Sequence, residues 1–127
     1  MPHFIIECSQ DILLQRTPDE IMDTVYSVAE SVNLFAIHDI KVRLQPYQYY
    51  RLGKNKKNFL HVFGYIMEGR STEQKANLST QISTRLTALF PDISFLSVNI
   101  NEFEAATYSN KALIHPENKD QDRHFGL

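Results

Sequence analysis

The second residue, Pro2, is the first candidate for chemistry, because a proline that begins a chain carries a secondary amine. Since Pro2 is small, we expect Met1 to be removed, so that the mature chain begins at Pro2. An α-amino group titrates at about 7.7–8.0, and burial or nearby cations lower this pKa toward neutrality. An amine poised near the working pH can abstract a proton next to a carbonyl. On the residues alone, a Met-Pro opening without a catalytic role is the more frequent case.

Three basic side chains are candidates for binding the acidic groups of a substrate. Arg70 ends a predicted strand just before a capped helix start, where free backbone N–H groups favour an anion, and its guanidinium can hold a carboxylate through two hydrogen bonds. Lys41 and Arg43 alternate with apolar residues on another predicted strand, so they share one face and could form a second anion site. The alternative for each is a solvent-facing charge, which we expect for at least one of Lys41 and Arg43.

The other chemically versatile side chains lack the spacing of a known kind of site. The histidines are His3, His38, His61, His115 and His124. None of them shows metal-ligand spacing, and Cys8 is the only cysteine, so we expect no metal. His3 and His61 occupy matching positions of two predicted strands, and we expect them to be structural. No G-x-S-x-G elbow supports nucleophilic catalysis by a serine.

The first half of the chain predicts a strand, a helix and a strand. Residues 2–8 are rich in β-branched and aromatic side chains, which are typical of a strand. The run from Thr17 to Glu20 predicts a helix start with a capping box, and Asn33 is a plausible stop. Residues 40–45 alternate between apolar and polar side chains, and Pro46 should end this second strand.

The second half repeats the same pattern. Residues 59–68 predict a strand, and Ser71 with Gln74 forms a second capping box. The helix that follows should end at Pro91, and residues 96–101 alternate as a fourth strand. The chain thus contains two successive β-α-β patterns.

These patterns predict one domain over residues 1–127, with pseudo-repeats 2–47 and 59–104, a polar connection at 47–58 and a tail at 105–127. The last part of the tail is charged and looks loose or partner-contacting. Each β-α-β unit should cross over right-handed and give parallel strands. The expected fold class is α/β (α+β), with the duplicated units forming a four-stranded sheet that carries two helices on one face. A small chain with one bare sheet face usually covers it by self-association.

Composition excludes several other classes of function. The net charge is −2, so the chain has no basic surplus for binding nucleic acid. No apolar run is long enough to span a bilayer, and the start lacks the features of a signal peptide. We therefore expect a cytoplasmic protein with no nucleic-acid or membrane partner.

Two short motifs resemble known enzymes. The opening PHFIIECS, residues 2–9, closely resembles the start of the 5-carboxymethyl-2-hydroxymuconate Δ-isomerase family in the tautomerase superfamily. The stretch EGRSTEQK, residues 68–75, resembles the strand-to-helix turn of 4-oxalocrotonate tautomerase, whose chain is about half as long. The resemblance extends from Pro2 to about Lys111, although outside the two motifs it lies in pattern and length more than in identity.

The resemblance implies a fold of two β-α-β units, a homotrimer with inward-facing sheets, and no metal or cofactor. It also implies that Pro2 is the general base that moves a proton between carbons of an unsaturated 2-hydroxy or 2-keto di- or tricarboxylic acid in aromatic-compound degradation. Arg70 matches one family arginine that binds a substrate carboxylate. Lys41 stands where the family has a second arginine, and Arg43 matches a further basic residue, so either could complete the second carboxylate site. Leu60 occupies the place of Pro2 in the second repeat, which implies one active site per subunit.

Two alternatives stay open at this point. The first is another enzyme of the tautomerase superfamily, with a different keto acid as substrate or with a decarboxylase or dehalogenase reaction. Lys41 favours this alternative, because a lysine keeps the charge of an arginine but loses its two-pronged hydrogen bonding. The second is a trimeric binding module without enzymatic activity, in which Pro2 would be blocked or buried away from any cleft.

Overall fold

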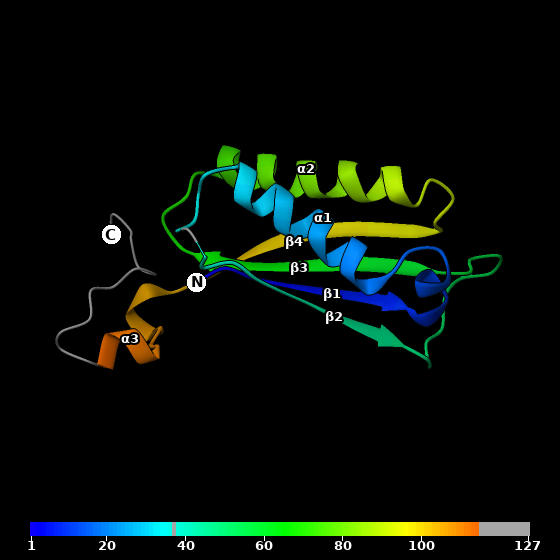
Figure 1. The fold of residues 1–127 in the computed structure, drawn as a ribbon, viewed down its shortest axis with the longest axis horizontal. Helices are drawn as coiled ribbons and strands as arrows, with labels where there is room; N and C mark the ends of the chain where they lie inside the picture. Colours follow the sequence, from blue (N-terminus) through cyan, green and yellow to red (C-terminus); the bar gives the residue numbers. More distant parts are fainter. Residues whose placement is uncertain (37, 115–127) are drawn as a thin grey trace.

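The computed structural model describes residues 1–36 and 38–114, and it consists of a four-stranded sheet with two long helices on one face (Figure 1). The charged end of the predicted tail, residues 115–127, lies outside the described residues. In chain order, the elements are β1 (His3–Ser9), η1 (Gln10–Leu14), α1 (Pro18–Ser31), β2 (Lys41–Tyr47), β3 (Phe59–Met67), α2 (Thr72–Leu89), β4 (Phe95–Phe103), η2 (Ala105–Thr107) and α3 (Lys111–Ile114).

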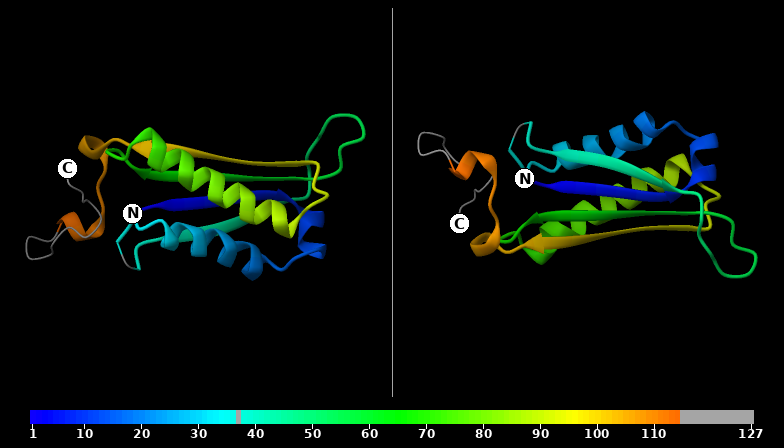
Figure 2. Two further views of the ribbon diagram at one scale, coloured as in Figure 1. Left: turned by 90° about the horizontal axis from the view of Figure 1, so that it is seen from above. Right: turned by 90° about the horizontal axis from the view of Figure 1, so that it is seen from below.

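The sheet confirms the expected duplication. Its strand order is β2-β1-β3-β4, and the two pairs within the repeats, β1 with β2 and β3 with β4, are parallel. The repeats meet through β1 and β3, which are antiparallel, so the start of β1 lies beside the end of β3. The turn that carries Arg70 therefore lies at the same end of the sheet as the amino terminus. The connection between β2 and β3 projects from the opposite end (Figure 2).

The local chemistry of the helix starts explains where α1 and α2 begin. The Ser71 hydroxyl accepts from the Gln74 N–H at 3.1 Å, and the Gln74 side chain accepts from the Ser71 N–H at 2.9 Å, which completes the predicted capping box. Thr17 accepts from the Glu20 N–H at 3.1 Å, but the Glu20 carboxylate pairs with Arg16 at 2.9 Å instead of completing a box. A side-chain cap of this kind stabilises a helix by about 1 kcal/mol.

The core lies between the sheet and the two helices, which run side by side over it (Figure 2). The fully buried side chains include Phe4, Ile6, Leu60 and Val62 on the strands, Ile21, Val25 and Val28 on α1, and Leu78, Ile82 and Leu86 on α2. Burial of each such side chain contributes about 1.5–3 kcal/mol. The apolar residues that recur in the sequence are thus the residues that line the core between the sheet and the helices.

Two features differ from the sequence prediction. Strand β2 does not stop before Pro46 but continues through it to Tyr47. The Lys41 N–H faces β1, so alternate residues of this edge strand point their N–H outward, and the missing N–H of Pro46 breaks no bond in the sheet. The short helix η1 was not predicted, although its Ile12 is fully buried and closes one end of the core.

The second face of the sheet is more open in the single chain. Its central strands expose a row of half-buried residues: His3, Ile5 and Glu7 on β1, and Phe59, His61, Phe63 and Tyr65 on β3. Antiparallel pairing places His3 opposite Tyr65 and His61 opposite Glu7. His61 is held by Ser97 and Asn99, each at 2.6 Å. Within the described part of the chain, no helix has the length and apolarity needed to cross a membrane.

Candidate active site

The amino end of β1 is fixed by backbone bonding to the neighbouring strand. The Lys41 N–H donates to the Pro2 carbonyl at 3.1 Å, which extends the β1–β2 ladder back to Pro2. Pro2 is buried, and so is Met1, which is 2% exposed. With Met1 attached, the Pro2 nitrogen is part of a peptide bond and has no basic lone pair. The candidate base can therefore act only in a chain that has lost Met1.

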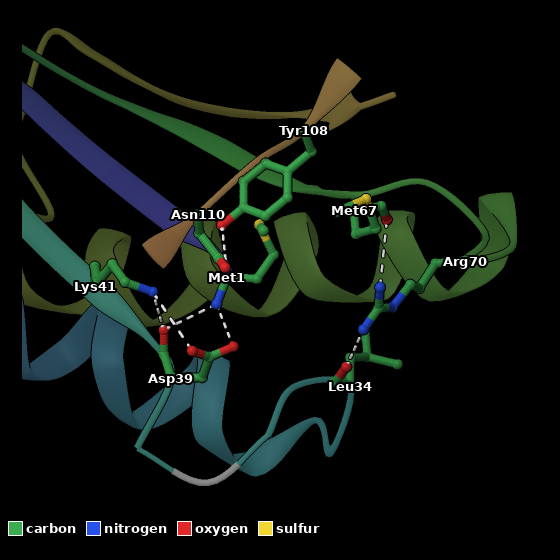
Figure 3. A network of polar contacts seen from close by, with 8 residues as sticks. All are labelled: Met1, Leu34, Asp39, Lys41, Met67, Arg70, Tyr108 and Asn110. Carbon is green, nitrogen blue, oxygen red and sulfur yellow. Dashed lines mark hydrogen bonds and ion pairs between the residues drawn. The ribbon is translucent and has the colours of Figure 1, made fainter. Parts of the chain in front are cut away.

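The first amine of the chain binds Asp39. The Met1 ammonium donates to the Asp39 backbone carbonyl at 3.2 Å and to the Asp39 carboxylate (Figure 3). Burial lowers the pKa of this amine, the bond to Asp39 opposes the change, and Lys41 adds to the lowering. The surroundings of the amino terminus thus favour a neutral amine, although the Asp39 carboxylate limits how far the pKa is lowered.

Lys41 reaches the same residue from β2. Its Nζ donates to the Asp39 carbonyl at 2.6 Å and lies 3.6 Å from the Asp39 carboxylate. The structure therefore brings Lys41 and the amino terminus together through Asp39, which the sequence interpretation did not single out. The sequence contained one signal for this role: Asp39 is an acid that lies two residues before Lys41, the first of two alternating basic residues.

Arg70 follows β3 in a turn where Gly69 takes the left-handed value φ 111°. Its guanidinium donates to the Met67 carbonyl at 3.3 Å and to the Leu34 carbonyl, and it lies 5.5 Å from the centre of the Phe35 ring. Burial lowers the Arg70 pKa, but a guanidinium stays charged in proteins. The backbone contacts fix the side chain between the end of β3 and the segment after α1.

Arg43 shares the open face of β2 with Lys41, as the alternation predicted, and both are exposed. Its Nη1 lies 3.1 Å from His3 Nδ1. Because a guanidinium can only donate, His3 accepts through Nδ1 and is neutral in this contact. Burial lowers the His3 pKa, and the charges of Lys41 and Arg43 lower it further. Arg43 therefore belongs to a cationic cluster on the open face, next to the start of β1.

Two hollows of the described part of the chain are bordered by candidate residues. Lys41 borders a groove of about 440 Å³ between α1 and β2, which also contains Met22 and Tyr26. Arg43 borders a hollow of about 320 Å³ on the open face, beside Glu7 and Tyr47. Neither lining includes Pro2 or Arg70.

The last described segment, which contains η2 and α3, lies at this same end of the molecule (Figure 1). Tyr108 and Asn110 lie beside Met1, and the Asn110 amide donates to the Tyr108 hydroxyl at 3.2 Å (Figure 3). No sequence pattern predicted this contact, because the pattern of the repeats decays after Phe103. In residues 1–36 and 38–114, no three His, Cys, Asp or Glu side chains gather in a way that could hold a metal ion.

Solved structures share this architecture. A 5-carboxymethyl-2-hydroxymuconate isomerase from Deinococcus radiodurans R1 is 25% identical, with a TM-score of 0.76 over 87% of this chain and 88% of that chain. A second structure, of a 5-carboxymethyl-2-hydroxymuconate delta-isomerase, is 14% identical, with a TM-score of 0.66 over 94% and 96% of the two chains. A fused 4-oxalocrotonate tautomerase that forms a symmetric trimer is 13% identical, with a TM-score of 0.70 over 86% and 93%.

The match of the sequence to a family model identifies the family more specifically than the shared fold does. No curated protein matches it significantly. The family model for 5-carboxymethyl-2-hydroxymuconate isomerase matches residues 2–117, and with the first structural neighbour it supports an isomerase or tautomerase activity. The chain, with its paired β-α-β units and its amino terminus beside the Arg70 turn, belongs to the 5-carboxymethyl-2-hydroxymuconate isomerase family.

Proposed function

We propose that the chain is a cofactor-independent isomerase in which Pro2, after removal of Met1, is the general base. The substrate is an unsaturated 2-hydroxy or 2-keto di- or tricarboxylic acid of the 5-carboxymethyl-2-hydroxymuconate type, from the degradation of aromatic compounds. The observation that supports this proposal is the antiparallel pairing of β1 with β3, by which the start of β1 and the Arg70 turn share one end of the sheet. Lys41 lies at the same end, because its backbone N–H donates to the Pro2 carbonyl.

The proposed reaction needs only a proton carrier and fixed cations. The neutral Pro2 amine takes a proton from the carbon next to the substrate carbonyl, which leaves a dienolate and an ammonium. The same proton then returns to a more distant carbon, so that the double bond moves and the amine is regenerated. Cations in a partly desolvated site stabilise the dienolate and lower the pKa of the amine, so one arrangement serves both steps.

The basic residues divide the binding of the substrate. Arg70, fixed by the Leu34 and Met67 carbonyls, is the proposed partner of one carboxylate. Lys41 or Arg43 is the proposed partner of the second. Lys41 lies closer to the amino terminus through Asp39, whereas Arg43 is tied to His3 on the open face.

A homotrimer is the proposed assembly. Half-buried Phe63 and Tyr65 on the open face would be covered if the sheets of three chains faced inward. The fused 4-oxalocrotonate tautomerase with the same fold is a symmetric trimer. A neighbouring chain at this face would also add a wall to the shallow hollow beside Arg43. Sedimentation analysis should therefore give a mass of three chains.

The proline is tested by changing it and by blocking it. We expect Pro2→Ala to lower kcat/KM for 5-carboxymethyl-2-hydroxymuconate by about 10²–10⁴-fold, the usual contribution of a general base. A chain with a non-removable peptide before Pro2 should be inactive, because its Pro2 nitrogen is an amide. Intact-mass measurement establishes the amino terminus of each sample. Full activity of either form would refute the proposed base.

A second candidate is a different acid, and Lys41 favours it, because a lysine stands where the family has an arginine. A panel of unsaturated keto acids and halogenated acids distinguishes the two. If another acid is turned over and 5-carboxymethyl-2-hydroxymuconate is not, the proposed substrate is wrong, but the proposed role of Pro2 as the base is unaffected. Trimers that turn over no acid of the panel would point to a binding module instead.

A further inference from the structure

We propose that Asp39 is a positioning residue for this reaction, which holds the amino-terminal amine and Lys41 at fixed places beside each other. The proposal rests on the proposed function, because it concerns the same base. Asp39 lies just before β2, and its N–H donates to the Ala36 carbonyl at 3.2 Å. That bond anchors the residue on the segment that leads from α1 to the sheet.

The contacts of Asp39 converge from two sides. Its carbonyl accepts from the Met1 amine at 3.2 Å and from Lys41 Nζ at 2.6 Å. Its carboxylate pairs with the Met1 amine and lies 3.6 Å from Lys41 Nζ. One residue therefore contacts two cations through both its backbone and its side chain (Figure 3).

Burial strengthens the contact between Asp39 and the Met1 amine, whereas the Lys41 side chain is 46% exposed and its contact is screened by water. The Asp39 side chain is 15% exposed and that of Met1 is 3% exposed. Charges interact more strongly in such surroundings than in water, so two cations this close would repel each other without the carboxylate. Asp39 thus allows a basic amine and a lysine to occupy the same end of the sheet.

The contact persists, in this proposal, when Met1 is gone. The Pro2 amine lies one residue further along the chain, about 3.8 Å away by Cα spacing. The Pro2 carbonyl stays bonded to the Lys41 N–H at 3.1 Å, which keeps β1 and the segment 39–41 in register. The carboxylate then stabilises the ammonium that forms when Pro2 takes the substrate proton. Asp39 also directs the Lys41 side chain toward the amino end of β1.

The test compares Asp39→Asn with Asp39→Glu in chains whose processed amino terminus has been verified by mass. We expect Asp39→Asn to move the acidic limb of the kcat/KM profile down by roughly one pH unit, because loss of the carboxylate lowers the pKa of the amine. The KM for the diacid should rise about tenfold as Lys41 loses its anchor. Asp39→Glu should restore most of the limb, since it keeps the charge.

Asp92→Asn is the matched control, because Asp92 is exposed and lies between α2 and β4, outside the proposed site. It should leave the pH profile unchanged. A reading that does not need turnover is the pH dependence with which the Pro2 amine reacts with an alkylating reagent, which gives the pKa of the amine directly. If Asp39→Asn is folded but leaves this pKa and the limb in place, or lowers activity equally at all pH values, Asp39 has no positioning role.

The two proposals fail in different ways. If Pro2→Ala keeps full activity, the base itself is wrong, whatever Asp39 does. If Pro2→Ala is inactive while Asp39→Asn titrates like the original chain, only the role of Asp39 is refuted. Should Asp39→Asn be unfolded, Asp39→Ser takes its place, because it also removes the carboxylate and should lower the amine pKa. An amine pKa in Asp39→Ser equal to that of the original chain would refute the proposal.

Discussion

Truncation of Arg70 should destabilise the fold as well as reduce activity, because its guanidinium joins the end of β3 to the segment after α1. Hydrogen bonds from a charged donor contribute about 1.5–3 kcal/mol each when well formed. The bond to Met67 is long at 3.3 Å and belongs at the lower limit of that range. The Phe35 ring adds about 0.5–1 kcal/mol. Allowing for the partial exposure of Arg70, we expect Arg70→Ala to lower the free energy of unfolding by about 2–3 kcal/mol.

The assay is urea unfolding at one fixed chain concentration, because any assembly makes the apparent stability depend on concentration. Arg70→Lys should lose about half as much, since an ammonium keeps the charge but cannot bridge the two carbonyls in the same plane. Arg85→Ala is the control, because Arg85 is exposed on α2 and should change stability by less than about 0.5 kcal/mol. An unfolding curve of Arg70→Ala that overlays the original would refute the bridging role.

Activity separates the structural role of Arg70 from the binding role. If Arg70 binds a substrate carboxylate as proposed, kcat/KM per folded chain should fall by about 10²-fold or more in Arg70→Ala. The loss should persist at low temperature, where the variant is fully folded. A variant that is destabilised but keeps its activity per folded chain would show that Arg70 only ties two segments together.

Three further predictions concern the sheet. The lowered His3 pKa means that the unfolded chain binds more protons than the folded one between the folded pKa and 6.5, so stability is fully present above pH 6.5 and is lost as the pH falls. Arg43→Ala should raise the His3 pKa, as followed by NMR, and narrow that window. Gly64→Ala should destabilise the chain by about 1–3 kcal/mol in thermal unfolding, because its Cβ would lie 2.6 Å from Ile100 Cδ1. The buried Cys8 thiol, whose pKa is raised to about 11, should react with a maleimide at pH 8 roughly 10²-fold more slowly than in urea.

Local chemistry explains which parts of the fold could be predicted. The Ser71 cap, the apolar spacing of both helices and the alternation around Val42 depend on residues a few positions apart, so they can be recognised in a sequence. Asn33, expected as the stop of the first helix, follows its cap with a left-handed φ of 57°. These features agree with the sequence prediction because each depends only on residues nearby in the chain.

The remaining features depend on contacts between distant segments. Pro46 can stay in a strand only because β2 lies at the edge, which local sequence does not reveal. Ile12 is buried by the sheet end that it covers, and its own segment has no clear periodicity. The role of Asp39 depends on the Met1 amine 38 residues away in the chain. The motifs were enough to name Pro2, Lys41 and Arg70 as residues of the proposed site. They were not enough to name Asp39, which contacts both Lys41 and the amino terminus.

The amino terminus links stability and activity in opposite directions. Met1 is 2% exposed, so its side chain contributes about 1.5–3 kcal/mol of apolar burial that a processed chain loses. Its ammonium pairs with Asp39, and this contact too would pass to a different nitrogen. Loss of Met1 creates the only form in which the Pro2 nitrogen is a basic amine, and it removes a side chain beside Asp39 and Tyr108 (Figure 3). In the proposed function, substrate approaches Pro2 at this place. Proteins commonly give up stability where an active site is built. We therefore expect the processed chain to be less stable than the form that keeps Met1. We also expect the processed chain to be the only one of the two that can transfer a proton.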